Sequence, residues 1–269
     1  MILLLAALLG LMVGSFLNVC IHRIPRRENI VYPASHCPSC GHSIRPYDNI
    51  PLISYLLLRG RCRSCGGRIP YRYPVVEAIT GLGFALLVDR FGTGLPTLLY
   101  MVFFSALVVL AFIDLEHQIL PDVITIWGII LGLPMALLPD FMASAGLPLR
   151  QILHLLKPGF VSSAAGLLLG GGLFWSIAVL TVVLLKKEGV GGGDIKLAAM
   201  IGSFLGWQRL LLTIFLATLS GSVVGILFLA LGLKGRKDPI PFGPFLSLGA
   251  FLSLLWGDSL IGWYARFLQ

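Results

Sequence analysis

Eight long apolar runs, separated by short polar or glycine-rich stretches, follow one another along the chain. A helix needs about 20 apolar residues to cross the hydrocarbon core of a bilayer, and most of these runs approach that length. The first run lacks the basic start and the small-residue cleavage site of a signal peptide, so we interpret it as a retained span. The runs cover residues 2–21, 75–89, 96–113, 122–139, 160–185, 195–206, 210–233 and 241–256.

The composition excludes a soluble globular protein. Hydrophobic residues make up 57% of the chain and charged residues only 12%, whereas charged residues form about 25% of a typical soluble domain. A soluble core of this size would still need a charged surface. The pattern therefore predicts an all-α polytopic membrane protein with about eight transmembrane helices.

Lysine and arginine are distributed unequally among the connections, and this sets the orientation. The loop at 22–74 holds nine arginines, and short basic loops remain in the cytoplasm. With this loop inside, alternation of the spans puts fifteen basic residues inside, five outside and both termini outside. The net charge of +8 thus reflects membrane topology, and we expect no nucleic-acid partner. Outside are Arg90, Arg150, Lys157, Arg209 and Arg266; inside, beyond the loop, are Lys186, Lys187, Lys196, Lys234, Arg236 and Lys237.

The basic loop contains two cysteine pairs, Cys37-x-x-Cys40 and Cys62-x-x-Cys65, with 21 residues between them. Four thiolates in two such pairs are the ligand set of a tetrahedral zinc site. Structural disulfides are disfavoured in the reducing cytoplasm, while redox-active dithiols and unliganded thiols stay open as alternatives. Because a loop of this size builds little core alone, a zinc ion would supply the stability that it lacks.

These features predict three parts of the chain. Residues 1–21 form the first transmembrane helix, residues 22–74 a cytoplasmic zinc-binding loop, and residues 75–269 a transmembrane core. The expected fold is therefore a helical membrane protein with a small zinc-binding module inserted after its first helix.

Two aspartates stand at the boundaries of the apolar runs. Asp114 ends the run at 96–113, and Asp194 ends the glycine string at 191–193. A carboxylate at a membrane boundary is costly to keep and is therefore a candidate functional residue. In the predicted topology both acids lie at the cytoplasmic face, although the topology was argued from lysine and arginine alone.

Each acid also has a purely structural interpretation. Asp114 could mark a helix end, with Glu116 and Asp122 solvating the same turn, and Asp194 could stabilise a helix N-terminus through the helix dipole. If the two acids face each other, however, they form the pair of an aspartyl protease. Two close carboxylates share one proton, so one acts as general base on water while the other donates to the scissile carbonyl oxygen.

Further stretches, taken in order, cover nearly the whole chain and carry a family resemblance. They are GSFLNVCIHRIP from Gly14, the two cysteine pairs, NIPLISYLLLRGRCRSC from Asn49, RYPVVE from Arg72, DLEHQILPD from Asp114, GGGDIKLAAMIG from Gly191 and PFGPFLSLG from Pro241. On these stretches the chain resembles the type IV prepilin peptidases, the bifunctional leader peptidases and N-methyltransferases of pilus and type II secretion systems.

The resemblance implies a site, a substrate and a cofactor. Asp114 and Asp194 would be the catalytic pair, and the basic leader of a prepilin or pseudopilin would be cut after a glycine at the cytoplasmic face of the inner membrane. The new N-terminal residue would then be methylated with S-adenosylmethionine. The resemblance links the cysteine loop with the bifunctional members, and it implies the lipid bilayer and pilus or type II secretion machinery as surroundings. It places no residue at the methyl-donor site.

Three other functions remain as alternatives to a bifunctional enzyme. The first is a peptidase without methyltransferase activity. The second is a transporter that uses Asp114 and Asp194 as a proton or cation relay, but relay acids usually lie near the bilayer midplane. The third is a zinc-bearing scaffold for secretion machinery, in which neutral substitutions of the two acids would leave the function intact.

Overall fold

The computed structural model describes residues 1–144, 159–186, 189, 191–232 and 240–267, and they are helical with no β-strand. Each of the eight predicted runs coincides with helix in this part of the chain. The chain divides into two compact units, Met1–Val109 and Leu110–Gln269. Some of the basic residues used to orient the spans lie outside the described residues: Arg150, Lys157, Lys187, Lys234, Arg236 and Lys237.

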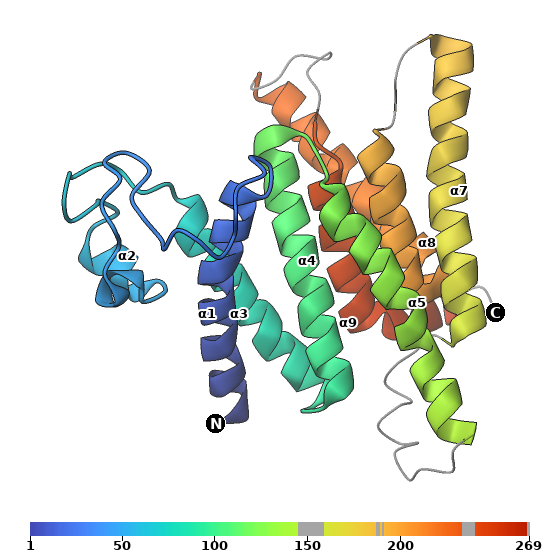
Figure 1. Cartoon of the computed structure of the whole chain (residues 1–269). Helices are drawn as coiled ribbons and strands as arrows, with labels where there is room; N and C mark the ends of the chain where they lie inside the picture. The colour runs from blue at the N-terminus through green and yellow to red at the C-terminus, as the bar shows by residue number, and fades with distance from the viewer. Residues whose placement is uncertain (145–158, 187–188, 190, 233–239, 268–269) are drawn as a thin grey trace. The chain divides into compact units, whose positions relative to one another are not determined.

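The first unit contains α1 (Ile2–Arg23), α3 (Arg72–Phe91) and the first part of α4 (Leu95–His117). Helices α1 and α3 pack side by side (Figure 1). Glycines let their backbones approach closely, because a β-carbon at Gly14 would lie 2.7 Å from the Cα of Glu77. The side-chain amide of Asn18 then donates to the Tyr73 carbonyl at 3.0 Å and ties α1 to the start of α3.

The segment between α1 and α3 forms a small module that contains the cysteines. It includes the 3₁₀-helix η1 (Pro46–Asn49) and the short helix α2 (Ile53–Leu57) (Figure 1). Each cysteine pair lies in a tight turn closed by an isolated antiparallel bridge, His36 with Ser43 and Arg61 with Arg68. The module therefore consists mainly of turns and has little secondary structure of its own.

The second unit contains the end of α4 together with α5 (Asp122–Ser144), α7 (Phe160–Leu185), α8 (Gly192–Ala230) and α9 (Gly243–Phe267). Helix α8 packs against α5, α7 and α9 and so forms the centre of this unit. Glycines again set the closest approach, since a β-carbon at Gly170 of α7 would lie 2.5 Å from the carbonyl oxygen of Ala198 in α8.

Helix α8 joins two runs that the sequence predicts as separate spans, 195–206 and 210–233. The helix axis is interrupted at Gly206, whose φ of 74° and ψ of 172° are not helical. Glycine adopts this positive φ without the steric cost that a side chain would impose. Helix α9, which follows α8 in the chain, also differs from the prediction. It extends to Phe267, whereas the predicted span ends at residue 256.

Within the described residues, five helices are long and apolar enough to cross a membrane: α1, α4, α7, α8 and α9. The predicted count of about eight is larger for identifiable reasons. Two predicted spans merge into α8, the apolar part of α5 is short, and α3 contains charged residues. Only 11% of the apolar window of α7 is buried, as expected for a helix that faces lipid. The chain is an all-helical, multi-pass membrane protein.

Candidate active site and metal centre

Asp114 lies near the C-terminal end of α4 and is only 6% exposed. The backbone N–H of Gly243, the first residue of α9, donates to its Oδ2 at 2.9 Å. This hydrogen bond joins residues 129 positions apart in the chain. It fixes one carboxylate oxygen and therefore the orientation of the whole group.

Only a residue without a side chain fits at position 243. A β-carbon there would lie 2.6 Å from Oδ2 of Asp114 and 3.2 Å from its Cγ, whereas nonbonded carbon atoms prefer about 3.5–4.0 Å. The PFGPF stretch therefore brings bare backbone against the acid. The sequence pattern alone does not reveal this role of Gly243.

Asp194 is the third residue of α8 and lies in its first turn. A carboxylate in this position is stabilised by the helix dipole. The backbone N–H of Asp194 donates to the carbonyl of Gly191, which precedes the helix, at 3.1 Å. The side chain is partly buried, so the acid stays accessible at the start of the helix.

The three glycines before Asp194 have different surroundings. A β-carbon at Gly193 would lie 2.8 Å from Cβ of Leu120, so this glycine lets the α4–α5 connection pack against the start of α8. At Gly192 a β-carbon would meet nothing within 4 Å. The string therefore combines one tightly packed position with exposed backbone beside the acid.

Asp114 and Asp194 come together in the second unit. They lie close enough for the charge of Asp114 to act directly on Asp194, although 79 residues separate them in the sequence. Two carboxyl groups in this relation can share one proton. The arrangement has the chemical elements of an acid–base pair, namely two carboxyl groups that interact electrostatically, one of which is held by a backbone donor.

The other acids near this pair have structural partners. Asp122, the first residue of α5, accepts a hydrogen bond from the Lys196 ammonium at 2.6 Å and so links α5 to α8. Glu116 is exposed in the last turn of α4, with its carboxylate 4.0 Å from the His117 ring. These contacts fit their interpretation as neighbours of the pair.

The four cysteines of the module form one cluster. The sulfur atoms of Cys37, Cys40, Cys62 and Cys65 all lie within 4.8 Å of one another. The Sγ atoms of Cys37 and Cys65 are 3.9 Å apart, close to the roughly 3.8 Å expected between tetrahedral ligands at Zn–S distances of about 2.3 Å. The cluster could therefore hold a metal ion.

The two cysteine turns have the same backbone geometry. The N–H of Cys37 donates to His42 at 2.9 Å and the N–H of Cys62 donates to Gly67 at 2.8 Å. A glycine follows the second cysteine of each pair, and both Gly41 and Gly66 have a φ of +70°. This repeated turn directs both sulfurs of a pair toward the same point.

The thiols of the cluster interact strongly. Burial raises the pKa of Cys37, but hydrogen bonds from the backbone of Ser39 and Cys40 outweigh it and lower that pKa to about 6. The backbone N–H of Gly67 lowers the pKa of Cys65, but hydrogen bonding to neighbouring thiols raises it to about 11. In the cluster without metal, Cys37 is therefore the thiol that ionises first. A metal ion would displace the protons from the remaining thiols.

Family models match the chain in two blocks. The bacterial peptidase A24 N-terminal domain matches residues 8–91, which include all four cysteines of the module. The type IV leader peptidase family matches residues 101–226, which include both aspartates of the pair.

Named relatives extend this similarity over most of the chain. The chain is 38% identical to the prepilin leader peptidase/N-methyltransferase of Aeromonas hydrophila over 97% of its length and 92% of the relative. It is also 38% identical to the protein of that name from Pseudomonas aeruginosa, with the same two coverages. For the Myxococcus xanthus protein of that name the identity is 43%, over 86% of this chain and 64% of the relative. No solved structure matches the chain.

Proposed function

Because the chain belongs to the type IV leader peptidase family, we propose that Asp114 and Asp194 are the catalytic pair with which it cleaves prepilin leaders. The protein is a prepilin leader peptidase with N-methyltransferase activity. The observation that supports the pair is their proximity in the second unit, where the charge of one acts on the other. The backbone hydrogen bond from Gly243 to Asp114 supports it further.

The proposed mechanism uses one carboxylate and one carboxylic acid. The carboxylate takes a proton from water as the water oxygen attacks the scissile carbonyl carbon. The protonated partner donates to the carbonyl oxygen, and the resulting tetrahedral intermediate collapses as the leaving amine takes up a proton. Gly243 holds Oδ2 of Asp114, and we assign the other oxygen of that carboxyl group to the water or the substrate.

The exposed backbone beside Asp194 suits a peptide substrate. A peptide bond inside a helix is shielded, so a prepilin must unwind locally before it can be cut. Gly192 has free space where a side chain would be, and an extended strand could approach there. Photocrosslinkers at positions 191–195 should form adducts with residues that flank the cut site. Adducts confined to the distal pilin helix would contradict this placement.

Substitution of each acid tests the pair. Asp114→Asn and Asp194→Asn keep the size of the side chain and remove its acid–base chemistry. We expect leader cleavage by purified protein to fall by at least 10²-fold, the lower range for general acid–base catalysis, while the protein still accumulates in the membrane. Asp122→Asn is the matched control, because it removes the charge of a nearby acid that pairs with Lys196. Full cleavage by either catalytic variant would remove the proposal.

We further propose that the site faces the cytoplasm at the inner membrane, where it meets the basic leaders of prepilins and pseudopilins. The nine arginines in the loop at 22–74 support this orientation. The orientation is tested by labelling Cys40 of the Cys62→Ser variant with thiol reagents that cannot cross the membrane. Labelling in inverted vesicles and not in intact cells is expected; the reverse pattern would contradict it.

For the cysteine cluster we propose one structural zinc ion, because four clustered sulfurs with no histidine in the group match a closed four-thiolate site. Cys37, Cys40, Cys62 and Cys65 would hold the ion. The module has few secondary-structure elements, so the metal would hold its two turns together. Elemental analysis should find about one zinc per chain, and metal-free protein of full stability would contradict the assignment.

We propose S-adenosylmethionine as the methyl donor, since its sulfonium group supplies an activated methyl group for transfer to an amine. The chain's own contribution is to bind the donor and to hold it in a defined orientation. A site for it therefore needs groups that compensate both the positive charges and the carboxylate of the donor.

A further inference from the structure

A cavity of about 380 Å³ lies in the first unit, between the cysteine module and the start of α3. We call it the module cavity. It is bounded by both cysteine turns, by the segment that contains η1 and α2, and by α3. Among the residues that line it are Arg45, Asp48, Leu52, Arg63, Tyr73 and Glu77. The proposed catalytic pair is not among its lining residues.

Glu77 provides a buried carboxyl group in the wall of the module cavity. The residue is 7% exposed. Its Oε2 accepts the backbone N–H of Leu52 at 2.8 Å. This donor is neutral, and no ion pair to Glu77 occurs in the described part of the chain. A buried carboxylate without a cation is costly, so a positively charged ligand would be favoured beside it.

Leu52 has an unusual backbone conformation at the same wall. Its φ of 59° and ψ of −48° are rare for a residue with a side chain. The hydrogen bond to Glu77 helps to hold this conformation. Strained backbone persists only where its surroundings enforce it, and such positions concentrate at ligand-binding sites.

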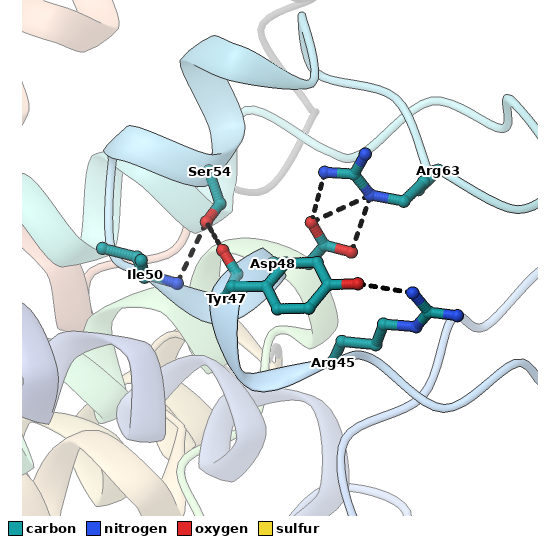
Figure 2. A network of polar contacts seen from close by, with 6 residues as sticks. All are labelled: Arg45, Tyr47, Asp48, Ile50, Ser54 and Arg63. Atoms are coloured by element: carbon teal, nitrogen blue, oxygen red, sulfur yellow. Dashed lines mark hydrogen bonds and ion pairs between the residues drawn. The ribbon is translucent and has the colours of Figure 1, made fainter.

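A cationic group forms another part of the wall. Figure 2 shows the polar contacts that hold it. The Arg63 guanidinium donates two hydrogen bonds to Asp48, from Nε to Oδ2 at 3.0 Å and from Nη2 to Oδ1 at 2.8 Å. The Arg63 guanidinium also lies 5.7 Å from the centre of the Tyr47 ring, and Arg45 donates to the Tyr47 hydroxyl. Two guanidinium groups around one carboxylate leave a net positive charge.

The segment behind this cationic group is fixed by Ser54. Its hydroxyl donates to the Tyr47 carbonyl at 2.8 Å and accepts the N–H of Ile50 at 3.0 Å (Figure 2). The opposite charges of the cavity, Glu77 on α3 and the arginines of the module, are therefore held on defined backbone. Tyr55 and Tyr73 add aromatic side chains to the lining.

We propose that the module cavity binds S-adenosylmethionine, with its positive charge toward Glu77 and its carboxylate toward Arg45 and Arg63. The aromatic side chains would pack against the adenine ring. This inference rests on the proposed methyl donor and not on the aspartate pair. In the transfer, the amine lone pair bonds the methyl carbon as the C–S electron pair returns to sulfur. S-adenosylhomocysteine leaves, and the amine releases a proton.

The test is calorimetric titration of the full chain, purified in detergent, with S-adenosylmethionine. Glu77→Gln keeps a side-chain oxygen for the Leu52 N–H but removes the charge, and we expect Kd to rise at least tenfold. Asp89→Asn removes an exposed acid of the same helix that does not line the cavity, and it should bind as wild type. Tyr73→Leu removes a lining ring and should also weaken binding.

Leader cleavage is measured on the same preparations. Weak donor binding with normal cleavage in Glu77→Gln and Tyr73→Leu would support the cavity independently of the aspartate pair. Wild-type Kd in both variants would overturn the cavity assignment while leaving the peptidase proposal untouched. If Glu77→Gln fails to accumulate, Tyr73→Leu with Asp89→Asn as reference decides the question.

Discussion

Replacing Gly243 with alanine places a methyl group against the carboxylate of Asp114. The new β-carbon would lie 2.6 Å from Oδ2, 3.2 Å from Cγ and 3.3 Å from Cβ of that residue. To bring the new β-carbon to an ordinary contact distance of about 3.5 Å from Oδ2, Asp114 and the start of α9 must move apart by roughly 1 Å. The same shift lengthens the 2.9 Å hydrogen bond from the Gly243 N–H.

A misplacement of about 1 Å at a catalytic group can lower the rate by roughly 10²-fold. This corresponds to about 2.7 kcal/mol of lost transition-state stabilisation. The assay is cleavage of a synthetic or purified prepilin by detergent-solubilised protein, with kcat and KM determined separately. Because Gly243 touches the acid and not the leader in this proposal, the loss should appear mainly in kcat.

The matched control is Gly262→Ala. Gly262 lies in the same helix, α9, and a β-carbon there would meet nothing within 4 Å. Both variants should accumulate equally in the membrane. Cleavage by Gly243→Ala at the control rate would refute the role of this backbone contact. If Gly243→Ala cleaves more slowly but is also less thermally stable than Gly262→Ala, the substitution affects the packing of α9 and not only the position of Asp114.

Three further outcomes are expected. Cys62→Ser should lose bound zinc and become susceptible to proteolysis between residues 30 and 70, because two turns with little secondary structure would lose their common ligand; retention of one zinc per chain would contradict this. Zinc affinity should fall throughout the range from pH 8 to pH 5, because protons compete with zinc for the thiols of higher pKa, and the fall should steepen below about pH 6, where the Cys37 thiolate also becomes protonated. Competition with a chelator at pH 5 to 8 measures the profile, and a flat one would count against thiolate ligation. Asp258→Asn should lower stability by about 1 kcal/mol, since it weakens the 2.9 Å ion pair that joins α9 to the largely buried Arg209 of α8; thermal unfolding that matches wild type would show that the pair is fully screened.

Local sequence patterns predicted the helices and the cysteine cluster well. A run of apolar residues long enough for a bilayer has few alternatives to helix, since every backbone polar group must be satisfied within the segment. The cysteine turns are equally local, because two residues separate the sulfurs and a glycine with positive φ follows each pair. Exact boundaries were less predictable, as the merging of two runs at Gly206 shows.

The sequence alone marked Asp114 and Asp194 as costly acids at membrane boundaries, and topology put them on one face. It could not show that their charges interact within one unit of the fold, nor that the Gly243 N–H holds one of them from 129 positions away in the chain. Nor could it reveal the buried carboxylate of Glu77 at the wall of a cavity. Hydrophobic periodicity and residue spacing act within one helix or turn, so they determine elements. Contacts between elements depend on which helix faces pack together, and only the tertiary structure decides that.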